Sequence, residues 1–320
     1  MAVMITNNIT QAVTALASGK LCAIPTETVY GLAANALDET AVARVFEAKE
    51  RPADHPLIVH VATAADVTEW ITELPQWAVD LTNAVWPGPL TIVGPRTSLA
   101  SNSVTGNQDT VAVRVPNHPI AQELLSELKN QGVKGLVAPS ANRFGHVSPT
   151  SAAHVSADLG EYLNAHEDLI LDGGDCQVGV ESTIVLATGS TPVILRPGAI
   201  TAADIERITG VKVSEETINS PRVSGALDSH YSPTAQVILI SDVSKTEFED
   251  NAGFLALAEV ATPAGLVRLA SPETIEDFAH ELYSSLRTGD DLNLRTIYVV
   301  PPVGEGLAQA INDRLNRAAF

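Results

Sequence analysis

Short apolar runs rich in β-branched residues alternate with segments of helical period along the chain, up to about Lys212. Apolar residues spaced three and four apart predict helices at residues 9–16, 40–46 and 118–132. Short buried strands are predicted at 21–24, 90–93, 111–115, 135–138, 169–172, 182–186 and 193–196. Because strands outnumber helices after Pro87, we expect an α/β (α+β) domain with a mixed, partly antiparallel sheet, and not a strict βαβ winding.

This pattern stops between residues 213 and 233, in the sequence VSEETINSPRVSGALDSHYSP. The segment is rich in Ser and Pro and has no sustained period, which is typical of a linker. A second α/β pattern follows, with strands expected at 235–240, 253–260 and 295–300. We therefore expect a first domain over 1–212, a linker over 213–233 and a small α/β domain over 234–320.

The second domain contains one helix with a clear sequence signature. Ser271 is expected to cap its first turn, with Pro272 and Glu273 at positions that favour a helix start. One apolar stripe then follows at Ile275, Phe278, Ala279, Leu282 and Leu286. Near the chain end, VGEGLAQAINDRL predicts a tight strand-to-helix turn, because Gln309 stands where a dinucleotide fingerprint has its third glycine.

Charge changes the picture more than composition does. The 320 residues include 19 Lys and Arg against 38 Asp and Glu, a formal net charge of -19. This balance repels polyanions at long range, so we expect no stable nucleic-acid binding over a broad surface, although a local basic pocket stays open. Cys22 and Cys176 lack a C-x-x-C spacing, which argues against a disulfide framework and a zinc knuckle and favours a reducing compartment. Without a signal-like N-terminus or an apolar run of about 18 residues, we expect a cytoplasmic protein that does not bind a membrane.

A cluster of polar residues directly follows the first predicted strand, which ends at Pro25. The cluster consists of Thr26, Glu27, Thr28 and Tyr30. A structural turn would explain the apolar residues and the glycine of this segment but not so many hydroxyls. We therefore treat the cluster as a candidate binding element.

Four cations stand near the ends of predicted elements. Lys49 and Arg51 fall where a helix gives way to Pro52, and two cations held close together suit phosphates, although they could simply complement the helix dipole. Arg114 lies within a strand and points away from its apolar neighbours, where it could form a structural salt bridge or bind a carboxylate or phosphate. Arg196 follows another strand and is equally ambiguous.

Two loops offer hydrogen-bond donors after a strand. Ser140 and Asn142 alternate beyond Pro139, at a strand end where α/β folds commonly place ligands, or else they form an ordinary Ser/Asn turn. The sequence LDGGDCQVGVEST has glycines that let a backbone approach an anion, or that build two tight turns. No G-x-x-x-x-G-K-[ST], H-E-x-x-H or G-x-S-x-G motif exists, so a P-loop, a zinc hydrolase and an α/β-hydrolase have no support.

Seven segments, taken in order, resemble the threonylcarbamoyl-AMP synthases of the Sua/YrdC/YciO family. They are PTETVYGLAANA, KERPADHPLIVHV, WPGPLTIV, VAVRVPNHP, APSANRFGHVSPT, DGG with VGVESTIV, and LRPGAI, and they span Pro25 to Ile200. SHYSP at 229–233, followed by an α/β tail, is similar to the longer subfamily with an added C-terminal domain. The resemblance implies a twisted mixed sheet surrounded by helices with a large, open, positively charged cavity, and a small Rossmann-like C-terminal domain.

The resemblance also implies a nucleotidyltransferase activity. Family members condense L-threonine, bicarbonate or carbon dioxide, and ATP into threonylcarbamoyl-AMP and pyrophosphate. Mg²⁺ is expected to be held mainly by the ATP phosphates, without protein metal ligands. The product is expected to pass to a tRNA threonylcarbamoyl-transferase complex for threonylcarbamoyladenosine modification.

By the family's motifs, two groups of residues should line the cavity. Those expected to bind ATP are Lys49, Arg51, Thr110, Ser140, Asn142, Ser182, Arg196 and His230. Those expected to hold threonine are Thr26, His60, Arg114 and the backbone of Ala138. Lys49 and Arg51 are the expected catalytic cations, and Tyr231 is expected to act with the linker as a lid over the cavity.

Two other functions stay open from the sequence. A basic cavity could hold a strand of RNA, which would make the protein a nucleic-acid-binding module, although the net charge and the lack of a basic, aromatic-rich stripe oppose this. A carbamoyl-phosphate-using transferase or a non-catalytic YciO-like relative would share the fold, and motifs alone do not exclude it.

Overall fold

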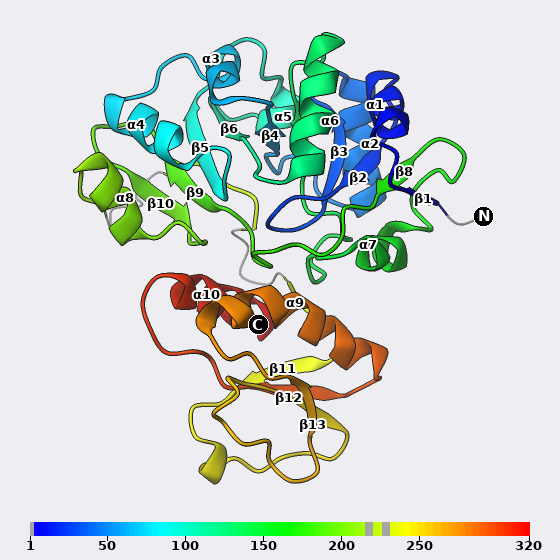
Figure 1. Ribbon diagram of the computed structural model, residues 1–320, viewed down its shortest axis with the longest axis vertical. Helices are drawn as coiled ribbons and strands as arrows, with labels where there is room; N and C mark the ends of the chain where they lie inside the picture. The colour runs from blue at the N-terminus through cyan, green and yellow to red at the C-terminus, as the bar shows by residue number, and fades with distance from the viewer. Residues whose placement is uncertain (1–2, 215–219, 226–230) are drawn as a thin grey trace.

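The described part of the chain forms two sheets, each with its own helices (Figure 1). This computed structural model describes residues 3–214, 220–225 and 231–320. The first sheet is ten-stranded, in the order β1-β8-β2-β3-β7-β4-β6-β5-β9-β10. Its strands are β1 (Met4–Thr6), β2 (Cys22–Ile24), β3 (Gly31–Asn35), β4 (Ile58–His60), β5 (Leu90–Pro95), β6 (Thr110–Arg114), β7 (Leu136–Val137), β8 (Leu169–Leu171), β9 (Thr183–Leu186) and β10 (Val193–Arg196).

Pairing in the first sheet is mixed, as the sequence predicts. β4 runs parallel to β6 and antiparallel to β7, and β5 runs antiparallel to β6 and parallel to β9. All seven strands predicted up to Lys212 are present, but the sequence pattern misses β1, β3 and β4. β1 and β4 have only three residues each, and the sequence GLAAN of β3 contains no β-branched residue to mark it as a strand.

Helices pack on both faces of this sheet. They are α1 (Ile9–Ala17), α2 (Glu39–Lys49), α3 (Val67–Trp70), α4 (Gln76–Val85), α5 (Asn102–Thr105), α6 (Pro119–Asn130), α7 (Ala152–Leu159) and α8 (Ala202–Thr209), with a 3-10 turn at Ala64–Asp66. The three predicted helices correspond to α1, α2 and α6. Buried residues of α1 and α6 form one core, and those of α2, α4 and α7 belong to a larger core.

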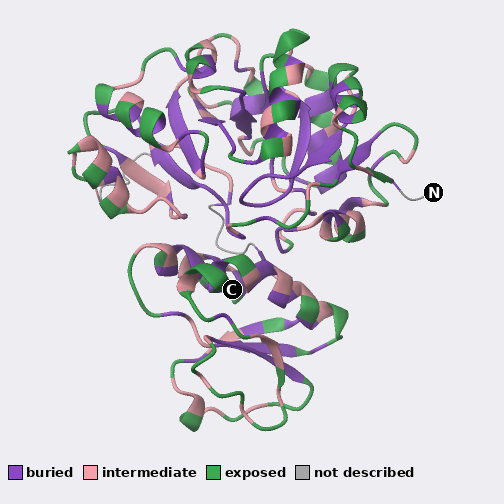
Figure 2. Ribbon diagram, in the orientation of Figure 1, coloured by how far each residue is buried: buried purple, intermediate pink, exposed green. Residues whose placement is uncertain are grey.

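Strand register decides which side chains face away from the larger core. Val59 and Val113 are paired on neighbouring strands and are buried in that core. The next pair, His60 and Arg114, points to the opposite face because successive side chains of a strand alternate. Figure 2 shows that the central strands of the first sheet are mostly buried (purple). α1 and α6 cover part of that face, around Leu136, and the remainder carries the candidate site.

The second sheet is entirely parallel, in the order β11-β14-β12-β13. Its elements are β11 (Gln236–Leu239), a 3-10 turn (Val243–Lys245), β12 (Ala252–Leu255), β13 (Val267–Ala270), α9 (Ile275–Asp291), β14 (Thr296–Val299) and α10 (Leu307–Ala318). α9 and α10 lie between this sheet and the first one (Figure 1). A parallel α/β arrangement after the linker is what the sequence predicts.

Two details of the second domain correct the sequence-based expectation. α9 is capped by Thr274 and not by Ser271, because Thr274 and Asp277 satisfy each other's backbone N–H groups in a capping box. The strand expected over 253–260 ends at Leu255. Beyond it, the carbonyl oxygens of a loop accept hydrogen bonds from Arg268 of β13, a strand that the pattern misses.

The sequence has no apolar run long enough to cross a membrane and no cysteine spacing typical of a disulfide framework. Within residues 3–214, 220–225 and 231–320, none of the helices is long and apolar enough to cross a membrane. Cys22 and Cys176 are buried free thiols. Burial raises the pKa of each to about 12, so neither is a thiolate at neutral pH.

Candidate functional site

A cavity of about 40 Å³ lies on the sheet face that α1 and α6 leave uncovered. It is smaller than the large, open cavity that the resemblance implies, because Ser224, Gly225 and Tyr231 of the linker contribute to its lining. Several predicted site residues line it, namely His60, Arg114, Ala138, Ser140, Ser182, Arg196 and Tyr231. His60, Arg114 and Arg196 are the last residues of β4, β6 and β10. The fold therefore brings residues from widely separated motifs to one place.

The end of α2 places two buried cations beside this cavity. Glu50 adopts a left-handed conformation (φ 51°), which ends the helix directly after Lys49 and turns the chain. Lys49 donates hydrogen bonds to the backbone carbonyl oxygens of Ser140 and Asn142. Among the described residues, neither Lys49 nor Arg51 forms an ion pair with a carboxylate, although both are buried.

Burial leaves these cations electrostatically unsatisfied. It lowers the pKa of Lys49 well below its usual value, and the positive charge of Arg51 lowers it further. The pKa of Arg51 falls to about 10, chiefly through burial, with Tyr231 opposing the decrease and Arg196 adding to it. A bound polyanion would supply the missing negative charge, so this side of the cavity suits phosphates.

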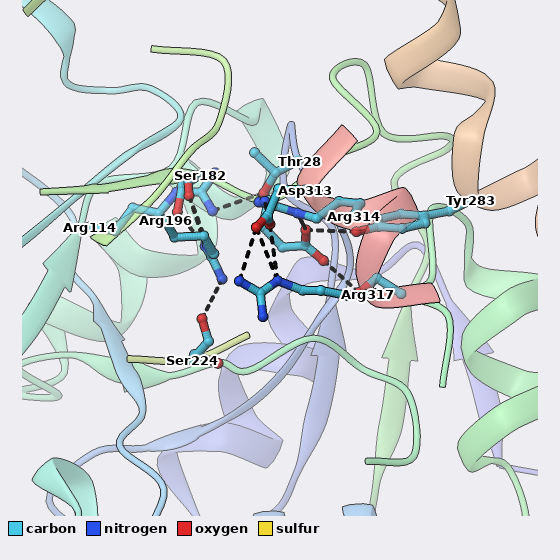
Figure 3. Close-up of polar contacts among 11 residues, drawn as sticks. Thr28, Arg114, Ser182, Arg196, Ser224, Tyr283, Asp313, Arg314 and Arg317 are labelled. Carbon is cyan, nitrogen blue, oxygen red and sulfur yellow. Dashed lines mark hydrogen bonds and ion pairs between the residues drawn. The ribbon is translucent and has the colours of Figure 1, made fainter. Parts of the chain in front are cut away.

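Arg196 is held by backbone oxygens from two different segments (Figure 3). Its Nε and Nη2 donate to the carbonyl oxygen of Ser182 at 3.2 and 2.9 Å, and its Nη1 donates to the carbonyl oxygen of Ser224 at 2.9 Å. The hydroxyl oxygens of Ser182 and Thr91 lie 2.8 Å apart. Nη2 of Arg51 lies 3.4 Å from Oγ of Ser224, so one linker residue contacts two of the cations.

Arg114 is anchored by the polar cluster that follows β2. Its Nη2 lies 2.7 Å from Oε1 of Glu27, and its Nη1 donates to Oγ1 of Thr28 at 2.9 Å. Glu27 and Arg114 are both almost fully buried. This pair fixes the guanidinium at the cavity wall, in a position that suits a carboxylate ligand.

His60 presents a neutral ring to the same side of the cavity. Its Nδ1 lies 3.2 Å from the carbonyl oxygen of Ile58, which can only accept, so in this hydrogen bond Nδ1 carries the proton and Nε2 keeps a lone pair. Burial lowers the pKa of His60 to about 3, and the charge of Arg114 contributes. At neutral pH, His60 is therefore a hydrogen-bond acceptor, suited to a hydroxyl or an ammonium group.

The polar cluster divides its roles between two threonines. Oγ1 of Thr26 donates to the carbonyl oxygen of Val29 at 2.6 Å and accepts from the N–H groups of Thr28 and Val29. Thr26 thus fixes the turn, whereas Thr28 lines the cavity. Direct contact of Thr26 with a substrate stays a prediction, and Thr28 is a cavity hydroxyl that the sequence did not separate from its neighbours.

The remaining predicted residues lie around the cavity or outside the described part of the chain. The side-chain amide of Asn142 donates to two carbonyl oxygens of its own loop at 2.7 and 2.8 Å. Thr110 lines a neighbouring hollow that shares Ser224 with the cavity. His230 lies outside the described residues.

Besides Thr28, two cavity-lining residues with polar side chains, Glu181 and Ser224, were not assigned a role from the sequence. Glu181 precedes Ser182, but a carboxylate is not expected at a site that binds anions. Ser224 belongs to the linker, where no periodic pattern marks any position. Glu181 lies within the motif VGVESTIV, and Ser224 lies five residues before SHYSP, so motif position was the only sequence signal for either residue.

The charged side chains around the cavity determine which ligands it can bind. Lys49, Arg51 and Arg196 offer cationic donors that no carboxylate of the described chain neutralises directly. Arg114 and His60 offer a cationic donor and a neutral acceptor. In the part of the chain that the structure describes, no group of three or more His, Cys, Asp or Glu side chains could hold a metal ion. The arrangement suits a polyanion on one side and a small molecule with a carboxylate on the other.

Comparison with known proteins identifies the family. Residues 14–198 match the Sua5/YciO/YrdC family model, described as telomere recombination, and residues 200–320 match the model described as threonylcarbamoyl-AMP synthase, C-terminal domain. The chain belongs to the Sua5/YciO/YrdC family. The threonylcarbamoyl-AMP synthase of Pyrococcus abyssi is 38% identical over 94% of this chain and 91% of its own. That of Bacillus subtilis is 35% identical over 97% of this chain and 92% of its own.

A solved Sua5 structure shares the whole architecture. The crystal structure of P. abyssi Sua5 complexed with L-threonine matches with a TM-score of 0.87 at 36% identity, covering 100% of this chain and 97% of that one. The large mixed sheet with its helices, and the separate parallel sheet of the second domain, are therefore the Sua5 fold. This likeness covers the linker and both domains, and not the motif-bearing domain alone.

Proposed function

We propose that this Sua5 family member is an L-threonylcarbamoyladenylate synthase, which condenses L-threonine, bicarbonate or carbon dioxide, and ATP into threonylcarbamoyl-AMP and pyrophosphate. The observation that carries the proposal is the presence of two unlike subsites around one cavity. Lys49, Arg51 and Arg196 make the first, and His60 and Arg114 make the second. The printed names of the two relatives and the L-threonine complex of P. abyssi Sua5 support the same activity.

L-Threonine fits the second subsite by its chemistry. The guanidinium of Arg114 would bind the carboxylate, and the free Nε2 of His60 would accept a hydrogen bond from the ammonium or the hydroxyl group. The side chains of Val29 and Ile58 also line the cavity, and they would contact the methyl group. A neutral His60 does not repel the substrate ammonium.

The reaction brings anions together, and the first subsite would make this possible. The threonine ammonium first loses a proton, and its nitrogen then bonds to the carbon of carbon dioxide while one C=O π pair moves to oxygen and a second N–H proton leaves to solvent, which gives a carbamate. A carbamate oxygen then attacks the α-phosphorus of ATP while the bond from that phosphorus to the bridging oxygen breaks, and pyrophosphate leaves. Lys49, Arg51 and Arg196 would offset the charge on the triphosphate and the leaving group, and holding the reactants in line would supply much of the rate. No covalent enzyme intermediate is needed.

We infer that Mg²⁺ enters with ATP, because triphosphate oxygens are the hard ligands that it prefers. The product is a mixed anhydride that water hydrolyses. We therefore propose direct hand-off to a tRNA threonylcarbamoyl-transferase complex, whose acceptor would be an adenosine of tRNA.

One assay tests this proposal. The chain is incubated with ATP, bicarbonate and Mg²⁺, with and without L-threonine, and pyrophosphate is measured. We expect release only when L-threonine is present. Equal pyrophosphate release with and without L-threonine would contradict the proposal. Salt-sensitive tRNA binding without any pyrophosphate release would favour a nucleic-acid-binding module.

A further inference from the structure

The second domain reaches the cavity through a buried ion pair. Nε of Arg314, on α10, donates to Oε2 of Glu181 at 3.0 Å, and the hydroxyl of Tyr283, on α9, donates to the same oxygen at 2.8 Å (Figure 3). The Arg314 side chain is 0% exposed. Oε1 of Glu181 accepts from the hydroxyl of Ser148 at 2.6 Å. A carboxylate that lines the cavity is thus neutralised by an arginine from the other domain.

The chain segment before Glu181 also rests on the second domain. Nδ1 of His280 lies 3.2 Å from the carbonyl oxygen of Gln177. Gly179 has φ +77°, and a Cβ atom there would lie 2.4 Å from the carbonyl oxygen of Ala279, so only glycine permits this approach. Val180 is buried in the core formed by α9 and α10. Residues 177–181 are therefore held in place by the second domain.

The residue after Glu181 holds a cation of the nucleotide side. The carbonyl oxygen of Ser182 accepts two hydrogen bonds from Arg196. Glu181 and Arg196 line the same cavity but do not form a direct ion pair. Arg314 thus contacts Glu181, and the next residue in the chain, Ser182, contacts Arg196.

The charge of Glu181 explains how loss of Arg314 would affect Arg196. Burial by itself raises the pKa of Glu181, but the charges of Arg314 and, next, Arg196 outweigh it and lower the pKa to about 2. The carboxylate is therefore ionised at neutral pH. If Arg314 were removed, Arg196, which lines the same cavity, would be the remaining cation that acts most strongly on Glu181, and a buried charge without a partner is strongly destabilising. Glu181 would then pull Arg196 toward itself and away from a phosphate.

From these contacts we propose that Arg314 is a positioning residue for the nucleotide site: it neutralises Glu181 and so keeps Arg196 available to the ATP phosphates. The inference rests on the proposed function in taking ATP as the anion. In this proposal the second domain affects ATP binding through Glu181, and none of its residues contacts a substrate. It also predicts that loss of Arg314 harms the site through the charge of Glu181, and that removal of this charge repairs it.

The experiment compares Arg314→Met, Glu181→Gln and the double variant in the full chain. Arg287→Met is the matched control. Like Arg314, Arg287 links the second domain to the first: it lies on α9 and donates to Asp158 at 2.8 Å, but it does not contact Glu181. The first readout is the Kd of Mg·ATP by isothermal titration calorimetry, which needs no turnover. The second is the KM for ATP against kcat in threonine-dependent pyrophosphate release.

We expect Arg314→Met to raise the Kd of Mg·ATP about tenfold or more, and the double variant to return it to within about threefold of wild type. Arg287→Met should stay within about twofold. A purely structural role for Arg314 would give no rescue by Glu181→Gln, and that result would overturn the proposal, as would wild-type affinity in Arg314→Met.

Two further comparisons keep the test decisive. If Arg314→Met does not fold, Glu181→Gln alone decides: it must bind Mg·ATP at least as tightly as wild type, and a tenfold loss would overturn the proposal. A wild-type chain that binds Mg·ATP but releases no pyrophosphate with threonine would contradict the proposed function, while the affinity comparison would still test Arg314. A wild-type chain that does not bind Mg·ATP would overturn both.

Discussion

The guanidinium of Arg196 donates a hydrogen bond of 2.9 Å to the backbone carbonyl oxygen of Ser224. Arg196 ends a strand of the first sheet, and Ser224 belongs to the segment that joins the two domains. A carbonyl oxygen thus occupies a donor that a phosphate oxygen would use. If ATP binds as we propose, this linker residue must give up its place on Arg196 when the nucleotide arrives.

The first prediction concerns the fork of Arg196. Arg196→Lys keeps the charge but cannot donate to the Ser182 carbonyl and to a phosphate in the same geometry. We expect the KM for ATP to rise about tenfold or more. Arg207→Lys is the control, because Arg207 is an exposed partner of Asp204 on α8 and should leave the KM unchanged. An unchanged KM in Arg196→Lys would contradict nucleotide binding by this residue.

The second prediction concerns the two cations at the end of α2. Lys49→Ala and Arg51→Ala should both fold, because neither residue takes part in an ion pair of the described chain. Each should lower kcat/KM by about 100-fold or more, since each removes a cation from where phosphate charge is greatest. Circular dichroism checks the fold, and pyrophosphate release checks the activity. Lys134→Ala removes an exposed partner of Glu69 and serves as the control. Wild-type turnover in either test variant would refute the assignment.

Much of the site could be predicted because its residues sit at element ends. Lys49 is the last residue of a helix whose end is marked by Pro52, and Ser140 and Asn142 follow a strand; the structure brings these three residues together, and their roles in binding ATP stay predictions. The division of labour between Thr26 and Thr28 could not be predicted in the same way. It depends on which hydroxyl the turn uses for its own hydrogen bonds.

Contacts between the domains were out of reach of the sequence. Glu181 and Arg314 are 133 positions apart, and nothing in either local pattern shows that α10 docks on the loop before β9. The sequence also misplaced the cap of α9. Ser271 and Pro272 carry a common start signal, but the helix begins three residues later, where the capping box of Thr274 and Asp277 satisfies two backbone N–H groups.

The third prediction concerns stability against pH. The folded-state pKa of His60, about 3, lies below the unfolded value of 6.5, so between these values the unfolded chain binds more protons. The contribution of neutral His60 is therefore fully present above pH 6.5 and is lost as the pH falls toward 3. In His60→Asn, the free energy of unfolding should fall less steeply over this window. Urea unfolding at a series of pH values measures it, with the exposed His166→Asn as the control. Equal slopes for wild type and His60→Asn would contradict the prediction.

The fourth prediction concerns the amino acid. Val29 and Ile58 line the same cavity as His60 and Arg114, so a threonine methyl group would gain apolar contact that serine lacks. We expect kcat/KM for L-serine to be about 10- to 200-fold lower than for L-threonine. Parallel pyrophosphate assays with the two amino acids measure the ratio. Equal values would show that the methyl group is not recognised.

The last prediction concerns the linker as a lid. Tyr231 lines the cavity and stacks on Tyr283 of α9 with ring centroids 5.6 Å apart, and Ser224 covers Arg196 from the same linker. A closing element of this kind would keep water from the mixed anhydride. We therefore expect a chain ending at Lys212, and full-length Tyr231→Ala, to keep a folded first domain and to lose threonine-dependent pyrophosphate release. Tyr231→Phe keeps the ring stack and is the matched control.

A passive tether is the competing interpretation, because the Tyr231 ring also belongs to the core that anchors the second domain. Limited proteolysis separates the two. A lid should become more resistant to cleavage within 213–233 when ATP and L-threonine are bound, whereas a tether should be cleaved at the same rate with and without them. The shortened chain gives the stricter test, provided that circular dichroism shows it to be folded. If it retained full activity, the lid would be wrong, and the contact between Ser224 and Arg196 would have no part in turnover.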